Sequence, residues 1–175
     1  MLDDLTEKIQ SSQGKLEGLM SKVPGFAGYK QKEQRREADK LLRLYVARQY
    51  EEQLTRLSNT QYALSSQGGL DALKSVAALE RGTTKLQLLI DRVKTASYGY
   101  AGLFDPIKVD EEVLDRLYEF DQAMLEGVDK LAASLDELDK AAQGEETISA
   151  QVNQVIAELE TLNNTFSRRQ DVILE

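Results

Sequence analysis

Residues 110–142 read DEEVLDRLYEFDQAMLEGVDKLAASLDELDKAA, and their apolar side chains recur at alternating steps of three and four residues. This heptad stripe is typical of a helix that buries one face and exposes a charged one. At about 1.5 Å per residue the helix is roughly 50 Å long, a length that suits a helical bundle better than an α/β domain. The predicted inward positions are Leu114, Leu117, Asp121, Met124, Val128, Leu131, Leu135, Leu138 and Ala142.

The start of this helix carries clear capping signals. Asp110 is suited to be the N-cap, and Glu111 and Glu112 would meet the positive end of the helix dipole. Val109 and Leu114 have the spacing of a hydrophobic staple. We therefore expect the helix to begin at residue 110.

The same three-four rhythm predicts four more helices, at about 2–22, 30–65, 70–96 and 147–173. No strand pattern interrupts them. The sequence thus predicts an all-α fold, a single domain over residues 1–175 built as an elongated antiparallel bundle of four long helices plus an N-terminal helix. Short connections favour consecutive helices as neighbours. The second and third helices are predicted to bury Ala38, Leu41, Leu42, Tyr45, Leu54, Leu57, Gln61, Leu64, Leu73, Val76, Leu79, Thr83, Leu86, Leu89, Ile90 and Val93.

Three local features qualify this pattern. Gly68 and Gly69 supply the conformation that ends a helix. Gly82 lies inside a predicted helix, where we expect a kink, a close helix crossing or a break. Charged and amide residues surround Tyr50, so that section is predicted either to be solvated or to contact a partner.

Composition excludes several classes of function. Among the 175 residues there is no Cys and no His, which rules out thiolate chemistry and a Glu-x-x-His di-iron site. A net charge of −8 argues against nucleic-acid binding by the molecule as a whole. The acidic start and the lack of a long apolar run predict a cytoplasmic protein.

No cofactor or metal site is predicted. The segment from Gly99 to Gly102 lacks the Lys-Ser/Thr continuation of a phosphate-binding loop. Asp121 is the acid on the inward stripe of helix 110–142. It is interpreted as a boundary residue or as half of a buried pair with Arg169, the alternative being an all-carboxylate metal site.

Two surfaces are candidates for partner binding. The aromatic segment 97–107 either covers one end of the bundle or anchors a partner. The basic start of helix 30–65 either lies beside the acidic helix 110–142 within one molecule, or pairs with it between molecules, or meets anionic lipid. With the middle of helix 30–65 added, the candidate residues are Tyr98, Tyr100, Leu103, Phe104, Lys32, Arg35, Arg36, Arg43 and Tyr50.

Two resemblances bear on function. The segments PGFAGYKQKEQRREADK (24–40) and YGYAGLFD (98–105) are similar to segments of uncharacterised bacterial all-helical proteins, a resemblance that implies no activity. The order of charges and the helix lengths resemble the plan of PspA- and ESCRT-III-like membrane scaffolds. The acidic first helix and the Gly68-Gly69 break depart from that plan.

We therefore expect a non-enzymatic scaffold or adaptor that acts through a protein partner or through self-association, without nucleic acid or cofactor. The alternative is a peripheral membrane scaffold that self-assembles, although the acidic first helix makes a membrane surface the less favoured partner.

Overall fold

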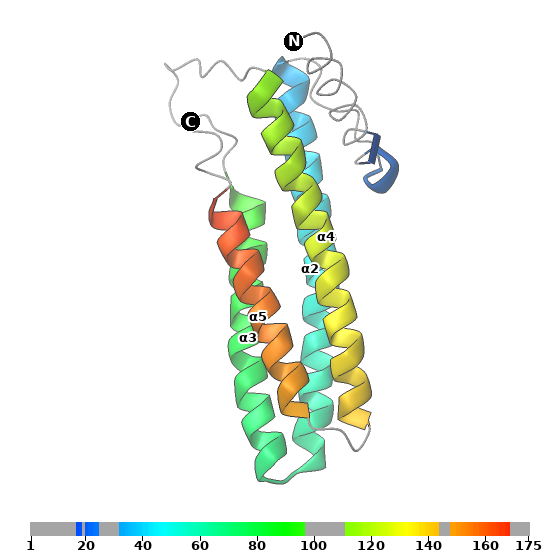
Figure 1. Cartoon of the computed structure of the whole chain (residues 1–175), viewed down its shortest axis with the longest axis vertical. Helices are drawn as coiled ribbons and strands as arrows, with labels where there is room; N and C mark the ends of the chain where they lie inside the picture. The colour runs from blue at the N-terminus through cyan, green and yellow to red at the C-terminus, as the bar shows by residue number, and fades with distance from the viewer. Residues whose placement is uncertain (1–16, 19, 25–31, 97–110, 144–147, 169–175) are drawn as a thin grey trace, which may run out of the picture.

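The computed structural model describes residues 17–18, 20–24, 32–96, 111–143 and 148–168, and these form an all-α bundle (Figure 1). Its long helices are α2 (Lys32–Gln67), α3 (Leu70–Thr95), α4 (Glu111–Gln143) and α5 (Ile148–Ser167). The described residues contain no strand. The predicted fold class is confirmed. The limits of the long helices lie within about two residues of the predicted ones, except that α5 ends at Ser167 whereas the predicted helix runs to about residue 173.

The bundle consists of two antiparallel hairpins, α2–α3 and α4–α5, packed against each other (Figure 1). In the first hairpin, Arg43 bonds to the end of α3 whereas Gln61 meets Thr83. Between the hairpins, successive contacts advance in the same direction along α2 and along α4. Tyr50 bonds to Met124, and further along α2 Arg56 bonds to Asp136. Helix α2 therefore runs parallel to α4.

The third and fifth helices are also parallel neighbours. The amide of Asn163 donates to the carbonyl of Lys85 at 3.2 Å, and further along both helices Arg92 donates to Ser167 at 2.9 Å. Among the described residues, α3 makes no backbone approach to α4. The expectation that consecutive helices are neighbours therefore holds within each hairpin and is wrong for α3 and α4, which occupy opposite corners of the bundle.

One apolar core runs the length of the bundle, as the heptad stripes predict. At one end of it, the rings of Phe120 and Phe166 meet edge to face, with centroids 6.1 Å apart, and the guanidinium of Arg92 lies 5.4 Å from the centre of the Phe166 ring. The largest fully buried side chains are Tyr50, Leu42, Leu57, Leu64, Leu79, Leu86, Leu89, Leu131, Leu135 and Leu138.

Two interior glycines mark close helix contacts. Gly82 lies within an unbroken α3, and a Cβ there would be 3.4 Å from Cδ1 of Leu159. The possible break at Gly82 is absent, and a Cβ there would have neighbours at ordinary contact distances. Gly127 in α4 is much more crowded, since a Cβ there would lie 2.3 Å from Cδ2 of Leu162 and 2.8 Å from the Tyr50 hydroxyl.

Two predicted core residues lie on the surface instead. Leu41 and Leu73 are exposed, whereas Leu42 and Ser75 take the neighbouring inward positions. Of the predicted first helix the structure describes only 17–18 and 20–24, where Val23 enters the core. The predicted cap at Asp110 and the inward positions Leu114 and Leu117 lie outside the described side chains.

Candidate functional site

The aromatic candidates cannot be placed. Tyr98, Tyr100, Leu103 and Phe104 lie outside the described residues, so the choice between a core lid and a partner anchor stays a prediction. Of the basic candidates, Lys32, Arg35 and Arg36 belong to α2, but their side chains are outside the described part of the chain.

Arg43 is tied to the end of α3. Its guanidinium donates to the carbonyls of Val93, at 3.3 Å, and Lys94, at 3.1 Å. The last carbonyls of a helix lack partners within the helix and sit at the negative end of its dipole, so a guanidinium there stabilises the helix terminus. This contact gives Arg43 a structural role in joining α2 to α3.

Tyr50 belongs to the core, and the prediction that this section of α2 is solvated or contacts a partner is wrong for its side chain. Tyr50 is fully buried, and its hydroxyl donates to the carbonyl of Met124 at 2.9 Å. Burial raises the pKa of the Tyr50 phenol, and the carboxylates of Glu158 and Asp129 raise it further. Ala47 and Gln53 are buried nearby on the same helix.

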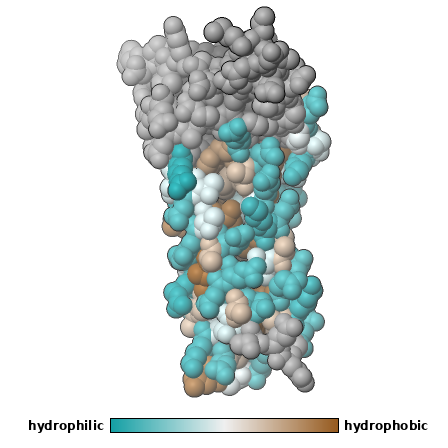
Figure 2. All heavy atoms as spheres, viewed as in Figure 1, coloured by the Kyte–Doolittle hydropathy of each residue, from teal (hydrophilic) through white to brown (hydrophobic). Residues whose placement is uncertain are grey.

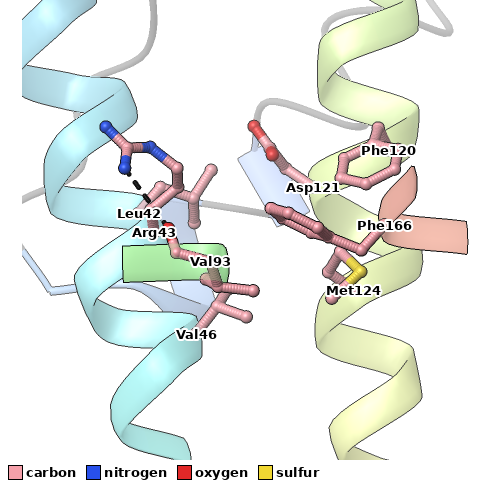
Figure 3. A pocket seen from close by; sticks show the side chains of 8 residues that line it. All are labelled: Leu42, Arg43, Val46, Val93, Phe120, Asp121, Met124 and Phe166. Carbon is pink, nitrogen blue, oxygen red and sulfur yellow. Dashed lines mark hydrogen bonds between the residues drawn. The ribbon is translucent and has the colours of Figure 1, made fainter. Parts of the chain in front are cut away.

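The buried acid Asp121 borders a small cavity near one end of the bundle (Figure 3). The cavity volume is about 10 Å³, enough for roughly one water molecule and too small for a substrate or cofactor. No cluster of three or more acidic side chains suited to a metal occurs in the described ranges. The predicted pairing with Arg169 lies outside those ranges. The cavity is lined by Leu42, Arg43, Val46, Val93, Phe120, Asp121, Met124 and Phe166.

A polar network joins α2 to α4. Arg56 donates to Asp136 at 2.5 Å and to Asp139 at 3.1 Å, and Thr60 donates to the second oxygen of Asp139. Partial burial opposes the charge of Arg56, but its hydrogen bonds to Asp136 and Asp139 outweigh this and raise its pKa. At this point a basic side chain of α2 meets the acidic face of α4 within one molecule. The predicted pairing concerned the basic start of α2, whose side chains Lys32, Arg35 and Arg36 lie outside the described part of the chain, and it stays a prediction.

Charge is divided unequally between the two hairpins. Helices α2 and α3 carry twelve Lys and Arg against eight Asp and Glu. Helices α4 and α5 carry three against twelve. The α4–α5 hairpin is therefore strongly acidic and its partner hairpin mildly basic.

Exposed apolar side chains are divided just as unequally. On the described helices, every exposed large hydrophobic side chain from α2 to α5 belongs to the α2–α3 hairpin. We call this surface the hairpin face. Sequence reasoning missed it, because Leu41 and Leu73 were predicted to face inward and the other exposed residues lie outside the predicted stripe. Its exposed residues are Leu41, Leu44, Tyr62, Leu70, Leu73 and Leu88.

Comparison with protein-family models, curated proteins and solved structures finds no match to this chain. No helix within the described ranges is both long enough and apolar enough to cross a membrane.

Proposed function

We propose that this chain is a non-enzymatic helical adaptor that binds a protein partner on the hairpin face. The observation that carries the proposal is the segregation of exposed large hydrophobic side chains to α2 and α3. Singly scattered apolar residues are normal on protein surfaces. Here, however, all six exposed large hydrophobic residues of the described long helices lie on one hairpin, and such a concentration favours a binding surface.

The composition of the hairpin face agrees with a binding role. Leu44 and Leu88 are each about half exposed, on different helices of the same hairpin. Partly exposed ion pairs also join the two helices of this hairpin, for example Lys94 with Glu51. An apolar surface interspersed with polar groups is typical of the interfaces of partners that exist separately as soluble proteins.

A variant with Leu44→Glu and Leu88→Glu tests the proposal. Both side chains are exposed, so we expect an unchanged melting temperature together with the loss of one specific partner. The wild type and the variant would be tagged and used to capture proteins from native cells. Each protein captured by the wild type but not by the variant would then be purified, and its affinity for both would be measured by calorimetry.

The matched control places the same charges on the other hairpin, at the exposed positions Ala133 and Ala157 of α4 and α5. Ala133→Glu with Ala157→Glu should leave the partner's affinity unchanged. A purified partner that binds wild type and the Leu44/Leu88 variant equally well, but not the control, would place the binding surface on α4–α5 and contradict the proposal.

A second candidate is a peripheral membrane scaffold. The observation that favours it is the net positive charge of the α2–α3 hairpin beside exposed leucines, since basic apolar surfaces bind anionic lipid. This candidate predicts sedimentation with phosphatidylserine vesicles that is weakened by salt and lost in the Leu44/Leu88 variant. If wild type stays in solution with such vesicles at low salt, the membrane candidate is wrong.

A further inference from the structure

A short segment that precedes α2 contributes one side chain to the core. Residues 20–24, which we call the strap, lie outside the four long helices, beside α4 on the side away from α5 (Figure 1). The chain is helical up to Lys22 and bends at Val23 and Pro24. Val23 is 1% exposed and belongs to the same apolar core as the long helices.

Few of the described contacts hold the strap in place. Among residues 17–18 and 20–24, Val23 alone is buried, and Met20 is 47% exposed. Lys22 pairs with Asp129 of α4 at 3.8 Å, but the two side chains are 50% and 75% exposed. Exposed ion pairs of this kind contribute little to stability. Within the described residues, burial of Val23 is therefore the main contribution to docking of the strap.

The strap meets α4 beside a buried leucine. Asp129, which pairs with Lys22, comes one turn after Leu125. Leu125 lies on the side of α4 that faces α2, because it is two turns before Ala132, whose carbonyl accepts a hydrogen bond from Arg56. The Lys22 contact thus places the strap at the level of Leu125.

Further along α4 the same edge is open to solvent. Asp136 is three turns beyond Leu125 and also faces α2, since it accepts a hydrogen bond from Arg56. Its side chain is 59% exposed, whereas Leu125 is 5% exposed. Packing of α2 against α4 therefore leaves this edge accessible where no further element lies beside it. The burial of Leu125 is accounted for by a cover that the strap is in position to supply.

The long helices close their core without the strap. The largest fully buried side chains all belong to α2, α3 and α4. On the face shown in Figure 2, polar side chains make up most of the described surface. Segments that contribute few buried apolar contacts open at a lower free energy than the core does. The strap can therefore leave α4 while the four-helix bundle stays folded.

We propose that the strap is a releasable, autoinhibitory cover, in which Val23 occupies a site at Leu125 and Asp129 that is open to a partner segment once the strap leaves. The site selects a segment with a cation for Asp129 followed by a branched apolar side chain for Leu125, the chemistry of Lys22 and Val23 themselves. A docked strap competes with such a segment, so the apparent affinity falls with the fraction of molecules in which the strap is released.

Trypsin cleavage after Lys22 in the full chain measures release, because proteolysis follows the population of the open form. Val23→Ser should raise the cleavage rate at least about tenfold, since burying a valine side chain changes an equilibrium by that factor or more. Met20→Ser alters an exposed residue of the same segment and should leave the rate unchanged. Each rate is divided by that of a free peptide of the same sequence. The melting temperature of the bundle should equal that of wild type in both variants.

A fluorescent peptide of residues 1–24 tests whether release uncovers a site. By anisotropy it should bind the full-length Val23→Ser chain at least about tenfold more tightly than wild type, whose own strap competes. Asp129→Lys in the Val23→Ser chain should weaken this binding by repelling Lys22 of the peptide. Glu137→Lys makes the same charge change at another exposed position of α4 and should leave the binding unchanged.

Three outcomes would overturn the proposal. Equal cleavage of Val23→Ser and wild type would show that Val23 does not hold the strap. A lower melting temperature in Val23→Ser would make the segment an integral part of the bundle. A peptide that binds both chains equally, or neither, would show that no site is uncovered. The proposal is independent of the hairpin face, because the Leu44/Leu88 variant should be cleaved after Lys22 at the wild-type rate.

Discussion

Gly127→Ala is expected to destabilise the bundle, although alanine is the better helix former. An added Cβ would lie 2.3 Å from Cδ2 of Leu162 and 2.8 Å from the hydroxyl of Tyr50. Ordinary carbon contacts are about 3.5–4.0 Å. Leu162 would therefore have to move by more than an ångström within the core, and the Tyr50 hydroxyl would be pushed from the Met124 carbonyl.

The magnitude follows from three terms. Overpacking a core typically costs about 1–3 kcal/mol. Losing the Tyr50 hydrogen bond adds about 0.5–1.5 kcal/mol. The gain in helix propensity on replacing glycine offsets about 1 kcal/mol. We expect a net loss of about 1–3 kcal/mol, equivalent to a melting temperature lower by roughly 3–10 °C for a chain of this size.

Gly82→Ala is the matched control. It makes the same chemical change inside another long helix, but there the nearest atoms to the new Cβ lie at 3.4, 3.8 and 3.9 Å. These are ordinary contacts, so the propensity gain should remain and the variant should be as stable as wild type or up to about 1 kcal/mol more stable. Urea denaturation monitored by circular dichroism measures both variants.

The opposite signs at Gly127 and Gly82 are the test of the reasoning. A Gly127→Ala variant as stable as Gly82→Ala would show that α4 and α5 are not packed as closely as described. Leu162→Ala removes the atoms nearest the new Cβ. In a double-mutant cycle, Gly127→Ala should therefore cost less in the Leu162→Ala background than in wild type, and strict additivity would contradict the clash.

Three further predictions concern the polar contacts between helices. Tyr50→Phe should cost about 0.5–1.5 kcal/mol at neutral pH. The folded-state pKa of Tyr50 lies above its ordinary value of 10.0, so its contribution is complete below pH 10 and lost as pH rises further; the alkaline fall in stability should therefore be shallower in Tyr50→Phe, and an equal fall would contradict this pKa. Arg56→Gln should destabilise by roughly 1–2 kcal/mol, less at high salt, because the partly exposed Arg56 bridges Asp136 and Asp139. Arg43→Met should lower hydrogen-exchange protection at the end of α3 and leave α5 unchanged; protection equal to wild type would show that the Arg43 contacts with Val93 and Lys94 do not hold that helix end.

The fold class followed from the sequence because helical periodicity reports which face of a segment is apolar. Leu131, Leu135 and Leu138 are all fully buried, as their spacing in α4 predicts. Periodicity does not report which neighbour covers that face. The parallel pairing of α2 with α4 depends on side chains that meet between the hairpins, such as Tyr50 at the space left by Gly127.

The errors have the same physical origin. Tyr50 lies between charged and amide residues in the sequence, and its partners Gly127 and Met124 are on another helix. Local polarity therefore suggested a surface position that packing between helices overrides. The error at Leu73 is the opposite one, since an apolar residue was placed inside although the buried stripe of α3 runs through Ser75 and Leu79 and leaves Leu73 on the outer face.

The distribution of charge and apolar surface limits where any partner can bind. A partner on the outer face of α4–α5 would meet acidic side chains and, on the described residues, no exposed large hydrophobic one, so it would have to be cationic and its affinity would fall steeply with salt. A partner on the hairpin face would gain affinity by burying leucine side chains and would depend little on salt. The salt dependence of the first partner identified therefore discriminates between the two faces before any variant is made, and a steep dependence would count against the adaptor surface proposed above.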